Sequence, residues 1–175
     1  MAYAPIPSNE VPRPHTLTVT VDNEPGALAR IVGMFSARGY NIESLTVADI
    51  SEGHELSRIT IVTTGTEHVV DQIMAQLERL IPVHRVTDLT AEGGHVEREM
   101  ALVKVRGKGD DRLEAMRLAE IYRARVVDAT MESFVFEITG TAEKVDQFID
   151  LMRQVGLVEI GKSGIVAISR GSEAG

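Results

Sequence analysis

The residues best placed to do chemistry in this sequence form the stretch 22–28, which reads Asp-Asn-Glu-Pro-Gly-Ala-Leu. It separates an alternating apolar and polar run, which predicts a strand, from an apolar stripe that predicts a helix. Pro25 suits the first helical position, where its missing N–H costs no hydrogen bond, and Asn23 or Glu24 can cap the helix. Gly26 has no Cβ, so a ligand can reach the main-chain amides around it. Because a helix start with free N–H groups attracts anions, this turn is a candidate carboxylate site; the alternative is an ordinary turn that binds nothing.

The other residue types that often do chemistry form no recognisable site. The five histidines have neither H-x-H nor H-x-x-x-H spacing, and each lies near the end of a predicted element. They are therefore expected at the surface, without a role as ligands: His15, His54, His68, His84 and His95. The absence of cysteine excludes disulfides, thiolate zinc sites and cysteine nucleophiles.

Two glycine-rich segments contain lysine but lack the spacing of a phosphate-binding loop. Segments 107–109 (Gly-Lys-Gly) and 161–164 (Gly-Lys-Ser-Gly) do not fit the pattern G-x-x-x-x-G-K-[ST], and no G-x-G-x-x-G follows a predicted strand. Paired carboxylates are interpreted as solvated groups at strand ends and turns; they are Glu97 with Glu99, and Asp110 with Asp111. Without a nucleophile and base, a poised acid–base pair or a metal site, we expect no enzyme activity from this chain alone.

The elements that must position the 22–28 turn have the order β-α-β-β-α-β. The predicted strands cover 16–21, 40–47, 56–64 and 83–89. The first predicted helix ends at Gly39, and its apolar stripe consists of Leu28, Ile31, Val32 and Phe35. The second predicted helix begins at Thr66 and is stopped by Pro82. Its apolar stripe consists of Val70, Ile73, Leu77 and Leu80. Two right-handed βαβ halves place four antiparallel strands against two helices and leave the other sheet face bare. A bare apolar face or an open edge predicts a partner, either another chain or a second copy of the unit.

The same element order recurs after Gly93-Gly94, which breaks the chain. Predicted strands cover 100–105, 125–130, 133–139, 157–160 and 165–168. One predicted helix spans 110–123 with Asp110 or Asp111 as its cap, and another opens at Thr141 with its stripe at Val145, Phe148, Ile149 and Met152. The 22–28 turn has no counterpart in residue types, because 106–111 reads Arg-Gly-Lys-Gly-Asp-Asp. The sequence thus predicts an α+β chain of two ferredoxin-like βαββαβ domains in tandem, which share a shape and differ in role.

Composition narrows the class of protein. Of 175 residues, 43% are apolar and 4% aromatic, so a packed core must consist mostly of aliphatic side chains. The net charge of −8 argues against a nucleic-acid partner, and no apolar run reaches the ~20 residues that a membrane-spanning helix needs. Residues 1–14 contain four prolines and lack the basic start and apolar centre of a signal peptide. We expect a soluble cytoplasmic protein with a flexible Pro-rich arm at 1–14, and neither a nucleic-acid nor a membrane partner.

In this context the 22–28 turn resembles the ligand loop of ACT domains, a family that binds free amino acids at interfaces between paired domains. Three further segments resemble parts of the small, regulatory subunit of acetolactate (acetohydroxyacid) synthase; they are 35–47, 95–105 and 163–171. The similarity covers roughly residues 15–171. It implies an N-terminal ACT domain at 15–90 that binds an amino acid, and a C-terminal ACT-like domain of the regulatory subunit at 95–170.

The resemblance implies a regulatory role in the biosynthesis of valine, leucine and isoleucine. In that family a catalytic large subunit condenses pyruvate with a second pyruvate or with 2-oxobutyrate. That partner uses thiamine diphosphate, a magnesium ion and FAD, whereas the small subunit carries no cofactor and no metal. The small subunit raises the activity of the large one. It also confers feedback inhibition by a branched-chain amino acid, usually valine, which binds where two ACT domains form a homodimer.

The resemblance also implies an effector site of eight residues: Asn23, Glu24, Pro25, Gly26, Ala27, Leu28, Asn41 and Ile42. Amides at 26–28 would bind the carboxylate of an amino acid, and the side-chain oxygens of Asn23 and Asn41 would accept hydrogen bonds from its ammonium group. Asn41, which is predicted to open the second strand, would face the turn of the other protomer. Ile42 would bound an apolar niche, where one methylene separates ligands by only ~1–3 kcal/mol, so discrimination among branched side chains would be modest. Without the resemblance, Asn23 reads as a helix cap and Asn41 as a turn residue after Gly39.

Three alternative functions are compatible with parts of the sequence. One is a free-standing ACT-type sensor that binds an amino acid and acts on another protein. Another is an enzyme with an unrecognised site. The third is a DNA-binding regulator, which the acidic composition and the lack of a basic recognition helix disfavour.

Overall fold

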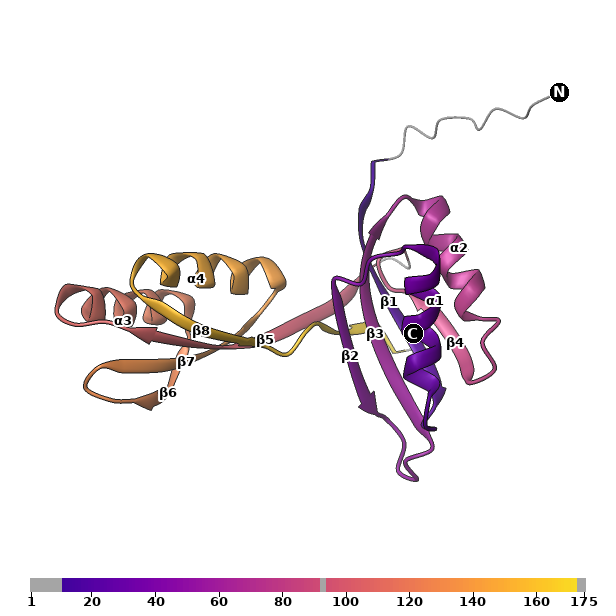
Figure 1. Cartoon of the computed structure of the whole chain (residues 1–175), viewed down its shortest axis with the longest axis horizontal. Coiled ribbons are helices and arrows are strands. Elements are labelled where there is room, and N and C mark those ends of the chain that lie inside the picture. The colour runs from indigo at the N-terminus through magenta and orange to yellow at the C-terminus, as the bar shows by residue number, and fades with distance from the viewer. Residues whose placement is uncertain (1–10, 92–93, 173–175) are drawn as a thin grey trace. The chain divides into compact units, whose positions relative to one another are not determined.

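The computed structural model describes residues 11–91 and 94–172, and contacts divide the chain into two compact units (Figure 1). The first unit runs to His95 and also includes the chain from Ser169 onward, and the second unit is Val96–Ile168. Most of the predicted arm at 1–14, and Gly93 of the predicted chain break, lie outside the described residues. The last two residues assigned to that arm, Arg13 and Pro14, lie in the first strand.

The first unit has the predicted β-α-β-β-α-β order. Its elements are β1 (Arg13–Asp22), α1 (Ala27–Arg38), β2 (Ser44–Asp49), β3 (Leu56–Gly65), α2 (Glu67–Leu77) and β4 (Val83–Asp88). The sheet order is β2-β3-β1-β4 with antiparallel neighbours, and α1 and α2 cover one face (Figure 1). Because β1 lies in the centre, its last residue Asp22 opens the 22–28 turn at the end of the sheet.

Half of the predicted apolar stripe on α1 faces the core. Ile31 and Phe35 are fully buried, whereas Leu28 is 39% and Val32 36% exposed. The helix starts at Ala27, and the side chains four and eight residues later lie on the same face as Ala27, which is also buried. Leu28 and Val32 are rotated by one residue around the helix axis. They leave an exposed apolar edge on α1.

The predicted start of α2 is confirmed, but its predicted stop is wrong. The Thr66 hydroxyl accepts a hydrogen bond from the Val69 amide at 3.4 Å, as a side-chain cap does. The helix ends at Leu77, five residues before Pro82, and a turn connects the two. Gly39 ends α1 as predicted, in the left-handed conformation with φ 70°.

The sheet face opposite the helices of the first unit, which was predicted to be bare, carries threonines at its centre. Thr18 on β1 is in register with Thr60 on β3 and with Thr87 on β4. Threonine suits a strand and pairs favourably with threonine across neighbouring strands. Thr18, Thr60 and Thr87 are only 2%, 4% and 3% exposed, so the centre of this face is already covered and the prediction that the face is bare is wrong there.

The second unit repeats the topology. Its elements are β5 (His95–Arg106), α3 (Asp110–Tyr122), β6 (Arg125–Ala129), β7 (Ser133–Gly140), α4 (Ala142–Gln154), β8 (Leu157–Lys162) and β9 (Val166–Ser169). The order β6-β7-β5-β8 matches that of the first sheet when the strands are counted from β5, and β9 adds a pairing to β5. The prediction of two ferredoxin-like units in tandem is confirmed.

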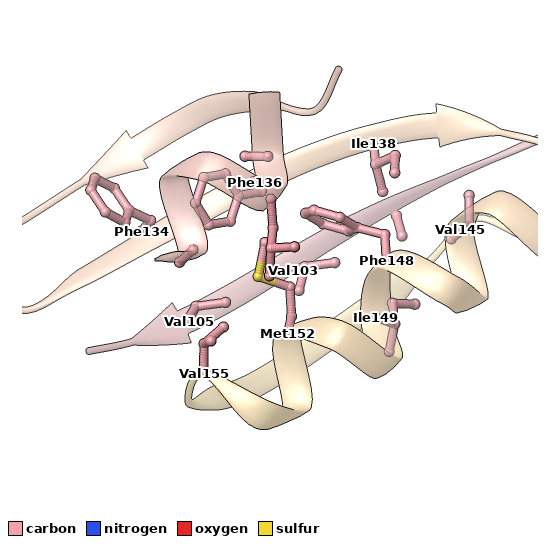
Figure 2. Packing of buried hydrophobic residues seen from close by; sticks show 14 residues of the cluster. Val103, Val105, Phe134, Phe136, Ile138, Val145, Phe148, Ile149, Met152 and Val155 are labelled. Carbon is pink, nitrogen blue, oxygen red and sulfur yellow. The ribbon is translucent and has the colours of Figure 1, made fainter. Parts of the chain in front are cut away.

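The core of the second unit lies between its sheet and the helices α3 and α4, and Figure 2 shows the side chains that α4 contributes. The predicted stripe on α4 is confirmed, since all four of its side chains are buried: Val145, Phe148, Ile149 and Met152. Phe148 meets Phe136 of β7 edge to face, with ring centroids 6.2 Å apart. Thr141 caps α4 through the Lys144 amide, also as predicted.

The predicted cap of α3 is wrong. Gly109, with φ 57°, stands at the cap, and Asp110 and Asp111 occupy the first turn. Carboxylates there still stabilise the helix, because they lie at the positive end of its dipole. No helix in the described part of the chain is long and apolar enough to cross a membrane.

Candidate functional site

The 22–28 turn is a Pro-Gly β-turn that precedes α1. The Ala27 amide donates to the Glu24 carbonyl oxygen at 3.2 Å, and Gly26 between them has φ 90° and ψ −9°. These angles, with Pro25 at the second and Gly26 at the third position, define a type II turn. The predictions that Pro25 opens the helix and that Asn23 or Glu24 caps it are wrong, since Gly26 is the cap and no side chain bonds to it.

The turn leaves two of the three predicted main-chain donors open at the start of α1. The Ala27 amide is occupied by the turn itself, so one of the three predicted donors is lost. Among the described residues, no hydrogen bond uses the amides of Gly26 or Leu28. Gly26 is exposed, and no atom lies within 4 Å of the place where a Cβ would stand. Two free N–H groups at a helix start, with the positive end of the dipole behind them, suit a carboxylate.

Asn23 is oriented by the turn between β2 and β3. Its side-chain Nδ2 donates to the His54 carbonyl at 2.9 Å, and its backbone N–H donates to the Glu55 carbonyl at 2.8 Å. Because a carbonyl oxygen only accepts, the amide nitrogen must face His54, and Oδ1 is turned away from it. This exposed side chain therefore presents an acceptor at the turn.

Asn41 and Ile42 lie in the segment between α1 and β2. The prediction that Asn41 opens the second strand is wrong, since β2 begins at Ser44. The Asn41 backbone is held by Thr63, whose hydroxyl donates to the Asn41 carbonyl at 2.7 Å, while its side chain is exposed and enters no hydrogen bond among the described residues. Ile42 is half-buried and packs against the core of the first unit. Within the described residues, no hydrogen bond or ion pair joins Asn41 or Ile42 to the 22–28 turn.

Histidine–carboxylate pairs flank the turn on both sides. His84 Nε2 lies 2.6 Å from Asp22 Oδ1, and His54 Nδ1 is hydrogen-bonded to Asp49 Oδ2. A hydrogen bond from the Ser51 backbone N–H, and then the His54 side chain, hold the pKa of Asp49 below its usual range. No sequence pattern connects 49–55 to this site, because the contact between Asn23 and His54 joins residues 31 positions apart.

The expectation that all histidines lie at the surface is wrong for His15. It is 1% exposed, and its Nδ1 lies 2.7 Å from Asp88 Oδ2. His15 stands two residues before Leu17 on β1, so strand alternation directs it to the helix-covered face, a signal that predicts its burial. Among the described residues no group of three or more histidine or acidic side chains is arranged to hold a metal ion.

Both units match models of known families. A family described as "AHAS small subunit-like ACT domain" matches residues 17–85. A second family, described as "Small subunit of acetolactate synthase", matches residues 98–171.

Relatives match over nearly the whole chain. A probable acetolactate synthase small subunit from Archaeoglobus fulgidus is 46% identical over 159 residues, which cover 91% of this chain and 98% of the relative. The acetolactate synthase isozyme 3 small subunit of Escherichia coli is 46% identical over 158 residues, covering 90% and 96%. A crystal structure of the acetolactate synthase small subunit from Thermotoga maritima superposes with a TM-score of 0.82 at 39% identity, covering 92% of this chain and 99% of that one. The chain therefore belongs to the family of acetolactate synthase small subunits.

Proposed function

We propose that this chain is a regulatory subunit that raises the activity of a catalytic acetolactate synthase subunit and makes it sensitive to a branched-chain amino acid. Membership of the small-subunit family supports the role in branched-chain amino acid biosynthesis. The observation that carries the effector site is the pair of open amides at Gly26 and Leu28 beside the free Oδ1 of Asn23. The catalytic partner would hold the thiamine diphosphate, magnesium and FAD.

The effector is a free amino acid with an apolar side chain. Its carboxylate binds the Gly26 and Leu28 amides, and its ammonium group donates to Asn23 Oδ1. The side chain of Asn41 from a second protomer provides a further acceptor for the ammonium group. Ile42 bounds the niche for the branched side chain of the effector. Valine fits this chemistry, and so do leucine and isoleucine.

The first unit has features that suit pairing of two copies. Strand β2 is an edge of its sheet, and Val47 on this strand is 44% exposed. Val47 is in register with Ile59, which belongs to the core under the helices. Val47 therefore lies on the helix-covered side of the sheet, the side on which α1 exposes Leu28 and Val32. An open edge beside apolar side chains favours association. If the effector bridges two protomers, its binding energy changes their arrangement, which can regulate the catalytic partner.

Reconstitution tests this proposal. The purified chain is added to the catalytic subunit, and acetolactate formation is measured with and without valine. We expect this chain to raise the rate and valine to lower it. A chain that binds valine without changing the rate is a free-standing sensor, and turnover without the catalytic subunit identifies an enzyme.

The variant Asn41→Ala tests the shared site. The exposed side chain is removed, while the Thr63 hydroxyl still holds the backbone carbonyl. We expect valine inhibition to be lost and activation of the catalytic subunit to remain mostly intact. Full valine sensitivity of this variant in the reconstituted assay would show that Asn41 is not an effector residue.

A further inference from the structure

The turn between β2 and β3 is bonded directly to the candidate effector turn. Two carbonyl groups of this turn, those of His54 and Glu55, accept hydrogen bonds from Asn23. The bond from the Asn23 backbone fixes the main chain, and the bond from Nδ2 fixes the side chain. Whatever orients the His54 carbonyl therefore orients the Asn23 oxygen.

His54 has a backbone conformation that is uncommon for a residue other than glycine. Its φ is 56°, in the left-handed region, and Arg123 is the one other non-glycine residue with a positive φ among the described residues. Histidine enters this region more often than most residues that have a Cβ, but the conformation is still strained and a local contact is needed to hold it.

Side chains of the same turn provide that contact. Asp49 Oδ2 accepts from His54 Nδ1, and Asp49 Oδ1 accepts from the Ser51 backbone N–H at 3.1 Å. The Ser51 hydroxyl oxygen accepts from the amides of Glu55 and Leu56 at 2.8 and 2.9 Å. Asp49 is ionised near neutral pH, and the bonds from Ser51 and His54, which favour the carboxylate, lower its pKa below the usual range. The turn is thus closed by its own side chains, without contributions from the core.

The second unit offers an internal comparison. There the Gly107 backbone N–H donates to the Glu132 carbonyl at 3.2 Å, in the same topological position as the bond from the Asn23 backbone to Glu55. The hairpin of the second unit is held by the Thr130 hydroxyl, which accepts from two backbone amides. It has no left-handed histidine and no asparagine facing it. The backbone bond therefore belongs to the fold, whereas the Asp49–His54 bond and the Asn23 side-chain bond are additions found in the first unit.

We propose that Asp49 and His54 are positioning residues for the effector site. Their hydrogen bond fixes the turn so that the His54 carbonyl holds the Asn23 amide group with Oδ1 directed toward the ammonium group of the effector. The role toward an effector rests on the proposed function, but the orientation of Asn23 does not. It can be tested on the protein without any ligand.

The first experiment measures hydrogen exchange of the Asn23 side-chain amide by NMR in the unliganded full-length chain. The Nδ2 protons are assigned by their disappearance in Asn23→Ala, and the urea-unfolded protein gives the unprotected rate. We expect slowed exchange in the parent protein and rates close to the unprotected one in Asp49→Ala and His54→Ala. His54→Asn should restore protection, because asparagine tolerates the left-handed conformation and its side-chain amide can donate to Asp49. Glu52→Ala is the matched control, since this exposed side chain of the same turn has no described partner.

The second experiment measures valine affinity by calorimetry. Loss of the orienting bond in Asp49→Ala should weaken binding by about 3- to 10-fold, the range expected for one hydrogen bond. Because Asp49 acts through Asn23, the double variant Asp49→Ala/Asn23→Ala should bind no more weakly than Asn23→Ala alone.

The outcomes separate the two ideas. Unchanged Asn23 exchange in Asp49→Ala, or fully additive losses of affinity, would overturn the positioning role. If the parent protein binds no branched-chain amino acid, the proposed function fails, and the exchange data still decide whether Asp49 and His54 orient Asn23.

Discussion

Gly26 is the residue on which the geometry of the candidate site depends most. The third position of a type II turn needs a positive φ, and Gly26 has φ 90°. An alanine there would meet no neighbouring atom, so its cost is backbone strain of about 1–2 kcal/mol. We expect Gly26→Ala to lower the free energy of unfolding by that amount, measured by urea denaturation, and to weaken valine binding because the turn and its amides shift.

Gly33 supplies the control for this prediction. It lies inside α1, its φ is not positive, and a Cβ there would also meet nothing. Gly33→Ala should therefore stabilise the protein by roughly 0.5–1 kcal/mol, since alanine is the better helix former. Equal effects of the two substitutions would contradict the assignment of Gly26 to a strained position.

His15 shows how a buried titratable pair differs from an exposed one. Removing its side chain leaves the buried Asp88 carboxylate without its nearest partner, although the Thr90 amide still donates to Asp88 Oδ1 at 2.9 Å. We expect His15→Ala to lower the free energy of unfolding by about 3 kcal/mol, as for a buried charged group that loses its hydrogen bond. His68 on α2 is exposed, so His68→Ala should change stability by less than about 0.5 kcal/mol in the same urea titration. A loss at His15 as small as that at His68 would contradict the pairing.

Helix starts could be predicted from the sequence where a side chain next to the first turn caps the helix. Thr66 and Thr141 cap their helices because a hydroxyl one position before the first turn suffices, and both predictions are confirmed. The caps of α1 and α3 were missed because glycine occupies them, at Gly26 and Gly109, while asparagine and acidic residues nearby rank higher as caps. At Gly26 the preceding proline was the signal to use, since Pro-Gly predicts a type II turn.

Lys162 links three elements of the second unit. Its Nζ, on β8, lies 2.9 Å from Glu99 Oε1 on β5 and 2.8 Å from Asp146 Oδ1 on α4. Partial burial lowers its pKa, but hydrogen bonds to Asp146 and Glu99 outweigh this and raise the pKa above the ordinary value of 10.5. A raised folded-state pKa contributes stability that is fully present below the unfolded value and is lost as the pH rises through the folded one.

This linkage predicts the pH dependence of a variant. Lys162→Met leaves the buried Glu99 carboxylate unpaired, so it should unfold a few degrees below the parent protein at pH 8, measured by circular dichroism. The difference in unfolding temperature should shrink as the pH rises above the ordinary lysine pKa of 10.5 and the parent lysine loses its charge. Lys108→Met, at an exposed lysine 3.6 Å from Glu132, should show little difference at either pH. If the difference in unfolding temperature stays constant up to the highest pH, packing of the Lys162 side chain, and not its charge, stabilises this cluster.

At the scale of the whole molecule, element order predicted the repeat, but only the structure shows how alike the two units are. In both, the residue that ends the first strand donates its N–H to a carbonyl before the last strand: Asp22 to Pro82 at 2.8 Å, and Arg106 to Gly156 at 2.8 Å. The residue types of the 22–28 turn can be read from the sequence, because they are consecutive. The geometry of the site cannot, because Asn23 is oriented by a turn about thirty residues away and local sequence does not encode that contact.

In the proposed function, association of two chains connects the effector site to regulation. If β2 pairs with its copy, a charge at Val47 must be buried without a partner, which association cannot compensate. We expect Val47→Lys to shift the protein toward the monomer in analytical ultracentrifugation and to weaken valine binding, with little change in unfolding. Ile81→Lys is the control, because Ile81 is 92% exposed in the turn before β4 and lies outside this edge. A Val47→Lys protein that stays dimeric and binds valine normally would place the interface elsewhere, and the effector would then have to act within a single protomer.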